Sequence, residues 1–238
     1  MPFYSSISRY YDEIFPTDDA EMAFVEKLLA GCKAVLDVGC GTGNKTELLA
    51  AAGRSITALD SDLGMIAVAR EKHAARGIKY RALGMQSIGT AFSKGSFDAL
   101  LCLGNTLAHL TDPQTIRKFL HDSSLLLQPG ALAVIQILNY EKILAEKLES
   151  LPLVETANLT FTRRYAWQGR ELRFLTTLFV KDSGEVLESD IPLYPLQKRE
   201  LDEMLDEAGF SQARYYGSYQ GDPLTDQSLP LIVTARKA

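Results

Sequence analysis

The chain has 238 residues, of which 46% are hydrophobic and 23% charged, and its formal net charge is −5. This apolar content is too high for a disordered chain and suffices for the core of one large α/β domain, or of one domain carrying a subdomain. No apolar run approaches the ~20 residues of a membrane span, and the acidic balance disfavours nucleic acid as the main partner. The three cysteines share no CxxC spacing, so neither a disulfide framework nor a zinc site is expected.

Helical and strand-like patterns alternate from the N-terminus, which is typical of a parallel α/β sheet. Short apolar runs predict strands at residues 34–38, 55–60, 78–83, 97–103, 131–138, 210–216 and 229–236. Periodicity, caps and terminal glycines predict helices after Asp18, from Asn44, over 62–76, after Asp112 and from Leu196. The triplet Gln128-Pro129-Gly130 is expected to separate the fourth helix from the fifth strand. We therefore expect a seven-stranded, mostly parallel sheet with helices on both faces.

The pattern changes after the fifth strand. Alternating apolar residues predict strands at residues 159–165, 172–180 and 186–193. Gln168-Gly169 is expected to form a turn, and Pro192 suits an edge strand. These strands predict an inserted antiparallel β meander. The expected domains are residues 1–150 together with 194–238, and the insertion at 151–193.

A glycine-rich stretch, Gly39-Cys40-Gly41-Thr42-Gly43, follows the first predicted strand, and a helix begins directly after it. Glycine is needed where the backbone turns tightly and approaches a ligand without a Cβ in the way. Asp60, at the end of the second strand, is placed to accept hydrogen bonds from a ribose diol. Together they predict a nucleoside cofactor. A dinucleotide site would show GxGxxG, which this stretch lacks, so a nicotinamide-dependent oxidoreductase is the weaker alternative.

The spacing Asp37-x-Gly-x-Gly-x-Gly resembles motif I of class I S-adenosylmethionine-dependent methyltransferases. The resemblance implies a Rossmann-like class I methyltransferase fold, S-adenosylmethionine as cofactor and S-adenosylhomocysteine as product. The implied cofactor-binding residues are Tyr11, Asp37, Gly39, Cys40, Gly41, Gly43, Asp60, Ser61, Met65, Met85, Gln86, Ser87, Leu103 and Gly104. Tyr11 resembles part of an aromatic N-terminal lid, and Met65 is placed to cover the adenine ring; core packing is the alternative for both. The resembled family usually has an acid after the third strand, where this chain has Gln86.

The segment Cys102–Leu110 resembles the corresponding segment of glycine N-methyltransferase and related small-molecule amine methyltransferases. On this resemblance, the candidates for the catalytic side of the site are Asn105, His109 and Tyr194. Simpler roles stay open: a hydrogen bond to backbone or adenosine for His109, loop support for Asn105 and packing for Tyr194. The resembled family has a carboxylate-binding arginine where this chain has Leu138, so glycine itself is not the expected acceptor.

These resemblances imply methyl transfer from S-adenosylmethionine to a small-molecule acceptor, preferably an amine nitrogen, by in-line displacement and without a metal. The alternatives are an RNA or protein methyltransferase, or a protein that binds the cofactor without turnover. Four arginines of the meander either bind an anionic substrate group or face solvent or a partner subunit; these are Arg163, Arg164, Arg170 and Arg173. We further expect a homodimer through the meander and, because no signal-peptide pattern opens the chain, a cytoplasmic protein.

Overall fold

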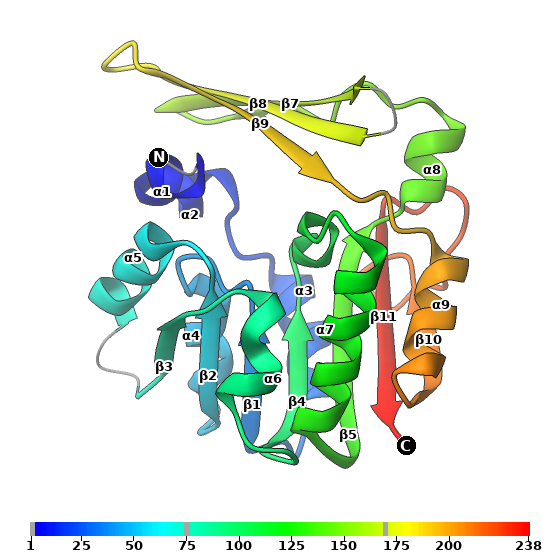
Figure 1. Cartoon of the computed structure of the whole chain (residues 1–238). Coiled ribbons are helices and arrows are strands. Elements are labelled where there is room, and N and C mark those ends of the chain that lie inside the picture. The colour runs from blue at the N-terminus through cyan, green and yellow to red at the C-terminus, as the bar shows by residue number, and fades with distance from the viewer. Residues whose placement is uncertain (1–2, 74–76, 169–170) are drawn as a thin grey trace.

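The computed structural model describes residues 3–73, 77–168 and 171–238, and a seven-stranded sheet lies at its centre (Figure 1). The strand order is β10-β11-β5-β4-β1-β2-β3; β11 is antiparallel to both of its neighbours, and the other pairs are parallel. The bounds are β1 Ala34–Val38, β2 Ser55–Asp60, β3 Lys79–Ala82, β4 Phe97–Cys102, β5 Leu127–Leu138, β10 Phe210–Tyr216 and β11 Pro230–Lys237. The predicted mostly parallel sheet is confirmed.

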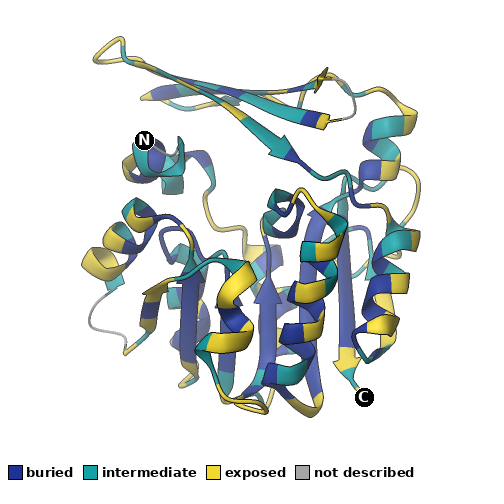
Figure 2. Cartoon of the chain, in the orientation of Figure 1, coloured by how far each residue is buried: buried dark blue, intermediate teal, exposed yellow. Residues whose placement is uncertain are grey.

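Helices cover both faces of this sheet, and the central strands are buried along nearly their whole length (Figure 2). One face packs against α3 (Asp19–Leu28), α4 (Asn44–Ala50) and α5 (Leu63–His73). The other packs against α6 (Ile88–Ala91), α7 (Pro113–Leu126) and α9 (Lys198–Glu207). The described residues also form three short helical segments: η3 (Met85–Ser87), η4 (Thr106–His109) and α8 (Tyr140–Ala145). Burial on two sides explains why the strand sequences are apolar without alternation.

Local capping signals begin two of these helices. Asp18 caps α3 by accepting a hydrogen bond from the backbone N–H of Glu21 at 2.8 Å. Asp112 caps α7 in the same way, with Pro113 at the first helical position. Both starts agree with the sequence prediction. The predicted end of α5 at Arg76 lies outside the described residues.

One predicted boundary is wrong. Residues 128–130 do not separate α7 from the next strand, because β5 begins at Leu127, immediately after the helix. Leu127 pairs with Phe97, and the next pair joins Leu132 to Ala99. The Gln-Pro-Gly triplet is therefore accommodated as an irregularity within the strand, where the proline needs no partner for a missing N–H.

The predicted meander forms a second sheet that lies across the carboxyl ends of the central strands (Figure 1). It has four strands in the order β6-β7-β8-β9, one more than the sequence predicts. The bounds are β6 Val154–Glu155, β7 Leu159–Gln168, β8 Glu171–Val180 and β9 Val186–Leu193. Pro192 stands in the edge strand β9, as expected. The predicted turn includes Gly169, which with Arg170 lies outside the described residues.

The N-terminal segment lies between this second sheet and the main domain (Figure 1). It consists of α1 (Phe3–Ile7), η1 (Ser8–Tyr10) and α2 (Tyr11–Ile14). Ile7 and Ile14 pack in one apolar cluster with Met65 of α5 and Phe161 of β7. The segment thus joins the insertion to the glycine-loop side of the domain. Nowhere in the described parts of the chain is a helix both long and apolar enough to cross a membrane.

Candidate active site

All three glycines of the loop after β1 adopt positive φ angles: 78° at Gly39, 57° at Gly41 and 78° at Gly43. A methyl group at Gly39 would overlap the side chain of Thr106, and one at Gly41 would lie 3.0 Å from the ring of Tyr11. The loop needs glycine both for its backbone conformation and for these close approaches. Its surface is left without side-chain bulk, as the sequence predicts.

Two carboxylates hold the loop. Asp37 is buried in β1 and accepts a hydrogen bond from the Thr46 hydroxyl at 2.6 Å, while burial raises the pKa of Asp37 to about 6. Asp60 accepts hydrogen bonds from the backbone N–H groups of Gly41 and Asp62, each at 2.9 Å. Burial raises the pKa of Asp60 too, although these backbone bonds oppose the shift. Asp60 therefore orders the glycine loop from the end of β2.

A cavity of about 250 Å³ lies between the glycine loop and the inner face of the meander. Its floor includes Asp37, Gly39 and Cys40, and one wall is formed by Leu103, Gly104, Asn105 and His109. Arg163 and Phe174 line it from the meander, and Tyr4, Tyr11 and Phe15 line it from the N-terminal segment. Four parts of the chain that are distant in sequence thus line one cavity.

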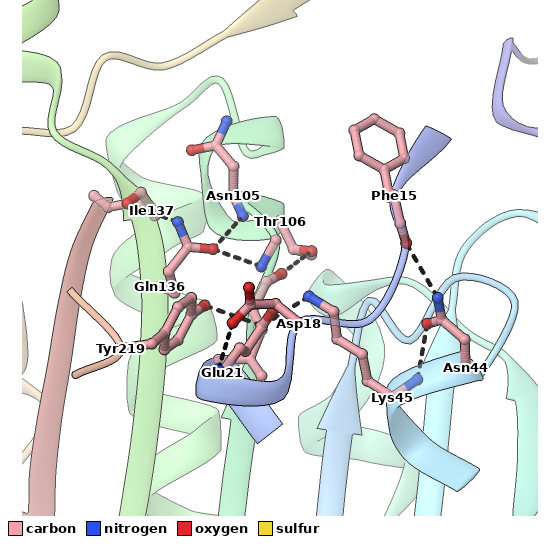
Figure 3. Close-up of polar contacts among 12 residues, drawn as sticks. Phe15, Asp18, Glu21, Asn44, Lys45, Asn105, Thr106, Gln136, Ile137 and Tyr219 are labelled. Carbon is pink, nitrogen blue, oxygen red and sulfur yellow. Dashed lines mark hydrogen bonds and ion pairs between the residues drawn. The ribbon is translucent and has the colours of Figure 1, made fainter. Parts of the chain in front are cut away.

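The wall after β4 is held by Gln136 of β5, a residue that the sequence analysis missed (Figure 3). The Gln136 side-chain oxygen accepts hydrogen bonds from the backbone N–H of Gly104 at 2.8 Å and of Asn105 at 3.2 Å. Asn105 has a positive φ of 62°, and its side chain accepts from the backbone N–H of Leu138 and donates to the Tyr140 hydroxyl, both at 3.0 Å. The Asn105 amide therefore supports the wall.

His109 closes the same wall at the end of η4. Its Nε2 atom lies 3.2 Å from the Tyr4 hydroxyl, and the two rings meet edge to face. Burial lowers the pKa of His109 to about 4, so the imidazole is uncharged at neutral pH. The structure therefore places an uncharged imidazole at the cavity, beside the Tyr4 hydroxyl.

A second feature missed from the sequence is a polar cluster at the start of α4 (Figure 3). The Lys45 ammonium forms an ion pair with Glu21 at 2.7 Å, and the Tyr219 hydroxyl donates to the same carboxylate at 3.0 Å. Asn44 donates to the backbone oxygen of Phe15 at 3.2 Å. Asn44, Lys45 and Phe15 all line the cavity, and Glu21 already neutralises the lysine. Only tertiary contacts reveal this cluster, because its members come from three separate segments.

The structure brings eight of the predicted site residues to the cavity: Tyr11, Asp37, Gly39, Cys40, Leu103, Gly104, Asn105 and His109. The predicted residues Gly41, Gly43, Asp60, Ser61, Met65, Met85, Gln86, Ser87 and Tyr194 are not among its lining residues. Met65 packs in the cluster beneath the N-terminal segment, and Tyr194 donates its hydroxyl hydrogen to Glu200 of α9 at 2.8 Å. The functional roles assigned to all of these residues stay predictions.

Comparison with known proteins points to methyltransferases, as the fold and the glycine loop do. Residues 35–130 match the family model described as "Methyltransferase domain". Rat glycine N-methyltransferase is 34% identical over 48% of this chain and 43% of its own length. A ubiquinone biosynthesis O-methyltransferase from Azotobacter vinelandii is 35% identical over 47% of this chain and 46% of its own length. This chain therefore aligns with less than half the length of either relative.

The similarity in fold extends further than the similarity in sequence. The structure of an S-adenosylmethionine-dependent methyltransferase from Clostridium acetobutylicum superposes with a TM-score of 0.85 at 15% identity, covering 99% of both chains. The fold is thus that of solved S-adenosylmethionine-dependent methyltransferases, and residues 35–130 resemble a methyltransferase domain. Within that class, the chain resembles glycine N-methyltransferase.

The residues present fit the cofactor of this class, S-adenosylmethionine. The glycine loop presents backbone without Cβ atoms at three positions, and the carboxylate of Asp60 stands at the end of the neighbouring strand. The ring of Tyr11 packs against Gly41, and burial raises the pKa of Tyr11, with a smaller contribution from the Asp60 charge. The phenol therefore lies near the carboxylate predicted to bind ribose.

Proposed function

We propose that this protein transfers a methyl group from S-adenosylmethionine to a small-molecule acceptor, preferably an amine nitrogen. The observation that carries the proposal is the cavity with the glycine loop on one side and the neutral imidazole of His109 on the wall. A space of about 250 Å³ that is covered by the meander and the N-terminal segment suits a small molecule. It disfavours the alternative of an RNA or protein acceptor.

In this proposal the protein contributes alignment and proton acceptance. When bound, S-adenosylmethionine supplies a methyl group on a sulfonium, which a nucleophile displaces in line. Asp37, Asp60 and the glycine loop hold the cofactor, and the Asn105 segment shapes the acceptor side. An amine attacks only as the free base. As the nitrogen–methyl bond forms and the methyl–sulfur bond breaks, the product is a methylated ammonium, and the uncharged imidazole of His109 is the acceptor for the proton that it releases. Desolvation in the cavity also disfavours the charged ammonium form.

The test is a search for acceptors with the purified full chain. The protein is incubated with methyl-labelled S-adenosylmethionine and fractionated cell metabolites, and both S-adenosylhomocysteine release and label transfer are measured. Labelled product whose fragmentation places the methyl group on nitrogen supports the proposal. Label on oxygen overturns the preference for amines, as the similarity to an O-methyltransferase allows. Cofactor binding without transfer to any acceptor supports the alternative of a non-catalytic binding protein.

Two further expectations belong to this proposal. A homodimer through the meander is supported by the exposed apolar side chains of Phe179 and Val186, which are neighbours on its outer face. Light scattering during gel filtration tests it, and a monomeric mass contradicts it. A reducing, cytoplasmic setting is supported by the three free cysteines: Cys32, Cys40 and Cys102.

A further inference from the structure

The inner face of the meander, which faces the cavity, is apolar except at its centre. Inward-facing residues of β7 alternate with outward-facing ones, and Arg163 follows Phe161 and precedes Tyr165 on the inner face. Arg163 pairs across the ladder with Thr176, itself buried. Among the described residues of β7, β8 and β9, Arg163 is the charged residue on this face. A charge surrounded by apolar side chains requires a compensating partner.

The protein supplies Arg163 with only part of that compensation. One terminal nitrogen donates to the backbone oxygen of Pro152 at 2.8 Å, but the Nε atom is buried and has no hydrogen-bond partner. None of the ion pairs found among the described residues includes Arg163. Burial accordingly lowers the pKa of the guanidinium. An anion at this site would satisfy both the open N–H and the charge.

On the opposite face of the same sheet, Arg173 provides a comparison, because its guanidinium is paired with carboxylates. Arg173 of β8 donates through Nε to Asp190 at 2.7 Å and forms a second ion pair with Glu171 at 3.2 Å. The two arginines thus belong to one meander, one facing the cavity without a carboxylate and one facing outward with two. Ordinary surface pairing explains Arg173 and does not explain Arg163.

The other charged groups of the cavity leave Arg163 available. Lys45 is paired with Glu21, and Asp37 is hydrogen-bonded to Thr46 on the floor. His109 is neutral, and Leu138, which also lines the cavity, carries no charge. Among the described residues that line the cavity, an anion entering from outside therefore finds one unpaired cation, on the meander side and across the cavity from the glycine loop.

We propose that Arg163 binds an oxyanion of the methyl acceptor, so the substrate is an amine that also carries a carboxylate or a phosphate. This inference rests on the proposed methyltransferase function and specifies its substrate class. The guanidinium fixes the anionic end of the acceptor at the meander, and the amine end extends toward the glycine loop and His109. A planar guanidinium can bind either oxyanion in bidentate fashion, so experiments must distinguish the two sources.

The test compares acceptors in matched pairs. Sarcosine and β-alanine are compared with their amides, and glucosamine 6-phosphate is compared with glucosamine, by S-adenosylhomocysteine release. We expect at least one anionic member to be methylated with a kcat/KM about tenfold or more above that of its neutral partner. The active pair tells a carboxylate from a phosphate. Equal turnover of neutral and anionic members overturns the inference and leaves the methyltransferase function standing.

Single-residue variants test whether Arg163 causes the preference for anionic acceptors. Arg163→Met should raise KM for the anionic acceptor about tenfold or more, with an unchanged Kd for S-adenosylmethionine, and Arg163→Lys should recover part of the loss. Arg173→Met is the matched control and should leave KM unchanged. If Arg163→Met instead weakens cofactor binding, the guanidinium binds the carboxylate of the cofactor, and the inference is wrong.

A binding measurement covers the case in which no acceptor of the panel is methylated. The complex with S-adenosylhomocysteine is treated with phenylglyoxal, and modification of Arg163 is followed by peptide mass spectrometry. Protection of Arg163 by sarcosine, β-alanine or glucosamine 6-phosphate, but not by the neutral partners, sustains the anion site even if methyl transfer fails. Absence of protection by all three anionic compounds overturns the site.

Discussion

The Tyr4 hydroxyl lies 3.2 Å from Nε2 of His109, which connects the N-terminal helix to the wall of the cavity formed after β4. The two residues are 105 positions apart in the chain. This contact places an imidazole, buried and uncharged, beneath the segment that covers the cavity. The covering segment and the proposed proton acceptor are therefore coupled, and changes in one should be measurable in the other.

Replacing Tyr4 with phenylalanine removes that hydrogen bond but keeps the ring contact. We expect the free energy of unfolding to fall by about 1 kcal/mol, the usual value for one hydrogen bond in a partly buried setting. The pKa of His109 should stay well below 6.5, because burial rather than the phenol causes the shift. Urea denaturation and a proton NMR titration of the imidazole test these two points; a return of the pKa to 6.5 would contradict the burial argument.

His109 also predicts a pH dependence of stability. Its pKa is about 4 in the folded protein and about 6.5 in the unfolded chain, so only the unfolded chain binds a proton between these values. The contribution of His109 is fully present above pH 6.5 and is lost as the pH falls toward 4. The difference in free energy of unfolding between His109→Gln and the wild type should therefore shift in favour of the variant by on the order of 2 kcal/mol when the pH falls from 7.5 to 4.5. Thermal melts at both pH values measure this difference, and parallel pH curves would refute it.

Asp37 predicts the opposite change of the free energy of unfolding with pH. Burial raises its pKa to about 6 in the folded protein, so between pH 4 and 6 the folded state binds a proton that the unfolded chain does not. Stability from this group is present below pH 4 and is lost as the pH rises through 6. Asp37→Asn should therefore be more stable than the wild type by on the order of 2 kcal/mol at pH 7.5, with the gain disappearing near pH 4. The same variant should bind S-adenosylmethionine more weakly, as calorimetry would show.

Asp60 offers the most direct test of the cofactor site. Asp60→Ala removes the acceptor for the backbone N–H groups of Gly41 and Asp62 as well as the predicted ribose ligand. We expect the Kd for S-adenosylhomocysteine to rise at least tenfold in titration calorimetry. Arg173→Met serves as the control, since that side chain lies on the outer face of the meander. Unchanged affinity of the Asp60 variant would show that the cofactor binds elsewhere.

Gly39 tests the close approach of the glycine loop to η4. In Gly39→Ala the new methyl group has to displace the side chain of Thr106, and the residue has to keep a φ near 78°. We expect a loss of about 2 kcal/mol in the free energy of unfolding and weaker cofactor binding. Gly53→Ala is a matched control, because Gly53 also has a positive φ but no atom lies near its Cβ position. Equal losses in both variants would assign the effect to backbone strain alone.

A residue of the candidate site could be predicted where neighbouring residues in the sequence mark its position. The glycines, Asp37 and Asp60 stand next to strands whose apolar runs are visible in the sequence, so their common edge of the sheet could be predicted. Gln136 gave no such signal: it lies within a strand, and its role arises because the loop after β4 folds back against its side chain. For Tyr194 the sequence context favoured a place in the site, whereas the structure shows its hydroxyl hydrogen-bonded to Glu200, away from the cavity lining.

By itself, the sequence determined the alternation of strands and helices, the glycine loop and the inserted meander. Periodicity, caps and turns act over a few residues, and each of these features is built from neighbours in the chain. Only the tertiary structure decided that Tyr4 meets His109 and that Arg163 faces the cavity while Arg173 faces outward. Those relationships depend on how the meander and the N-terminal segment pack over the sheet, and burial then sets the charge state of His109. Packing between distant segments, rather than local spacing, makes the cavity.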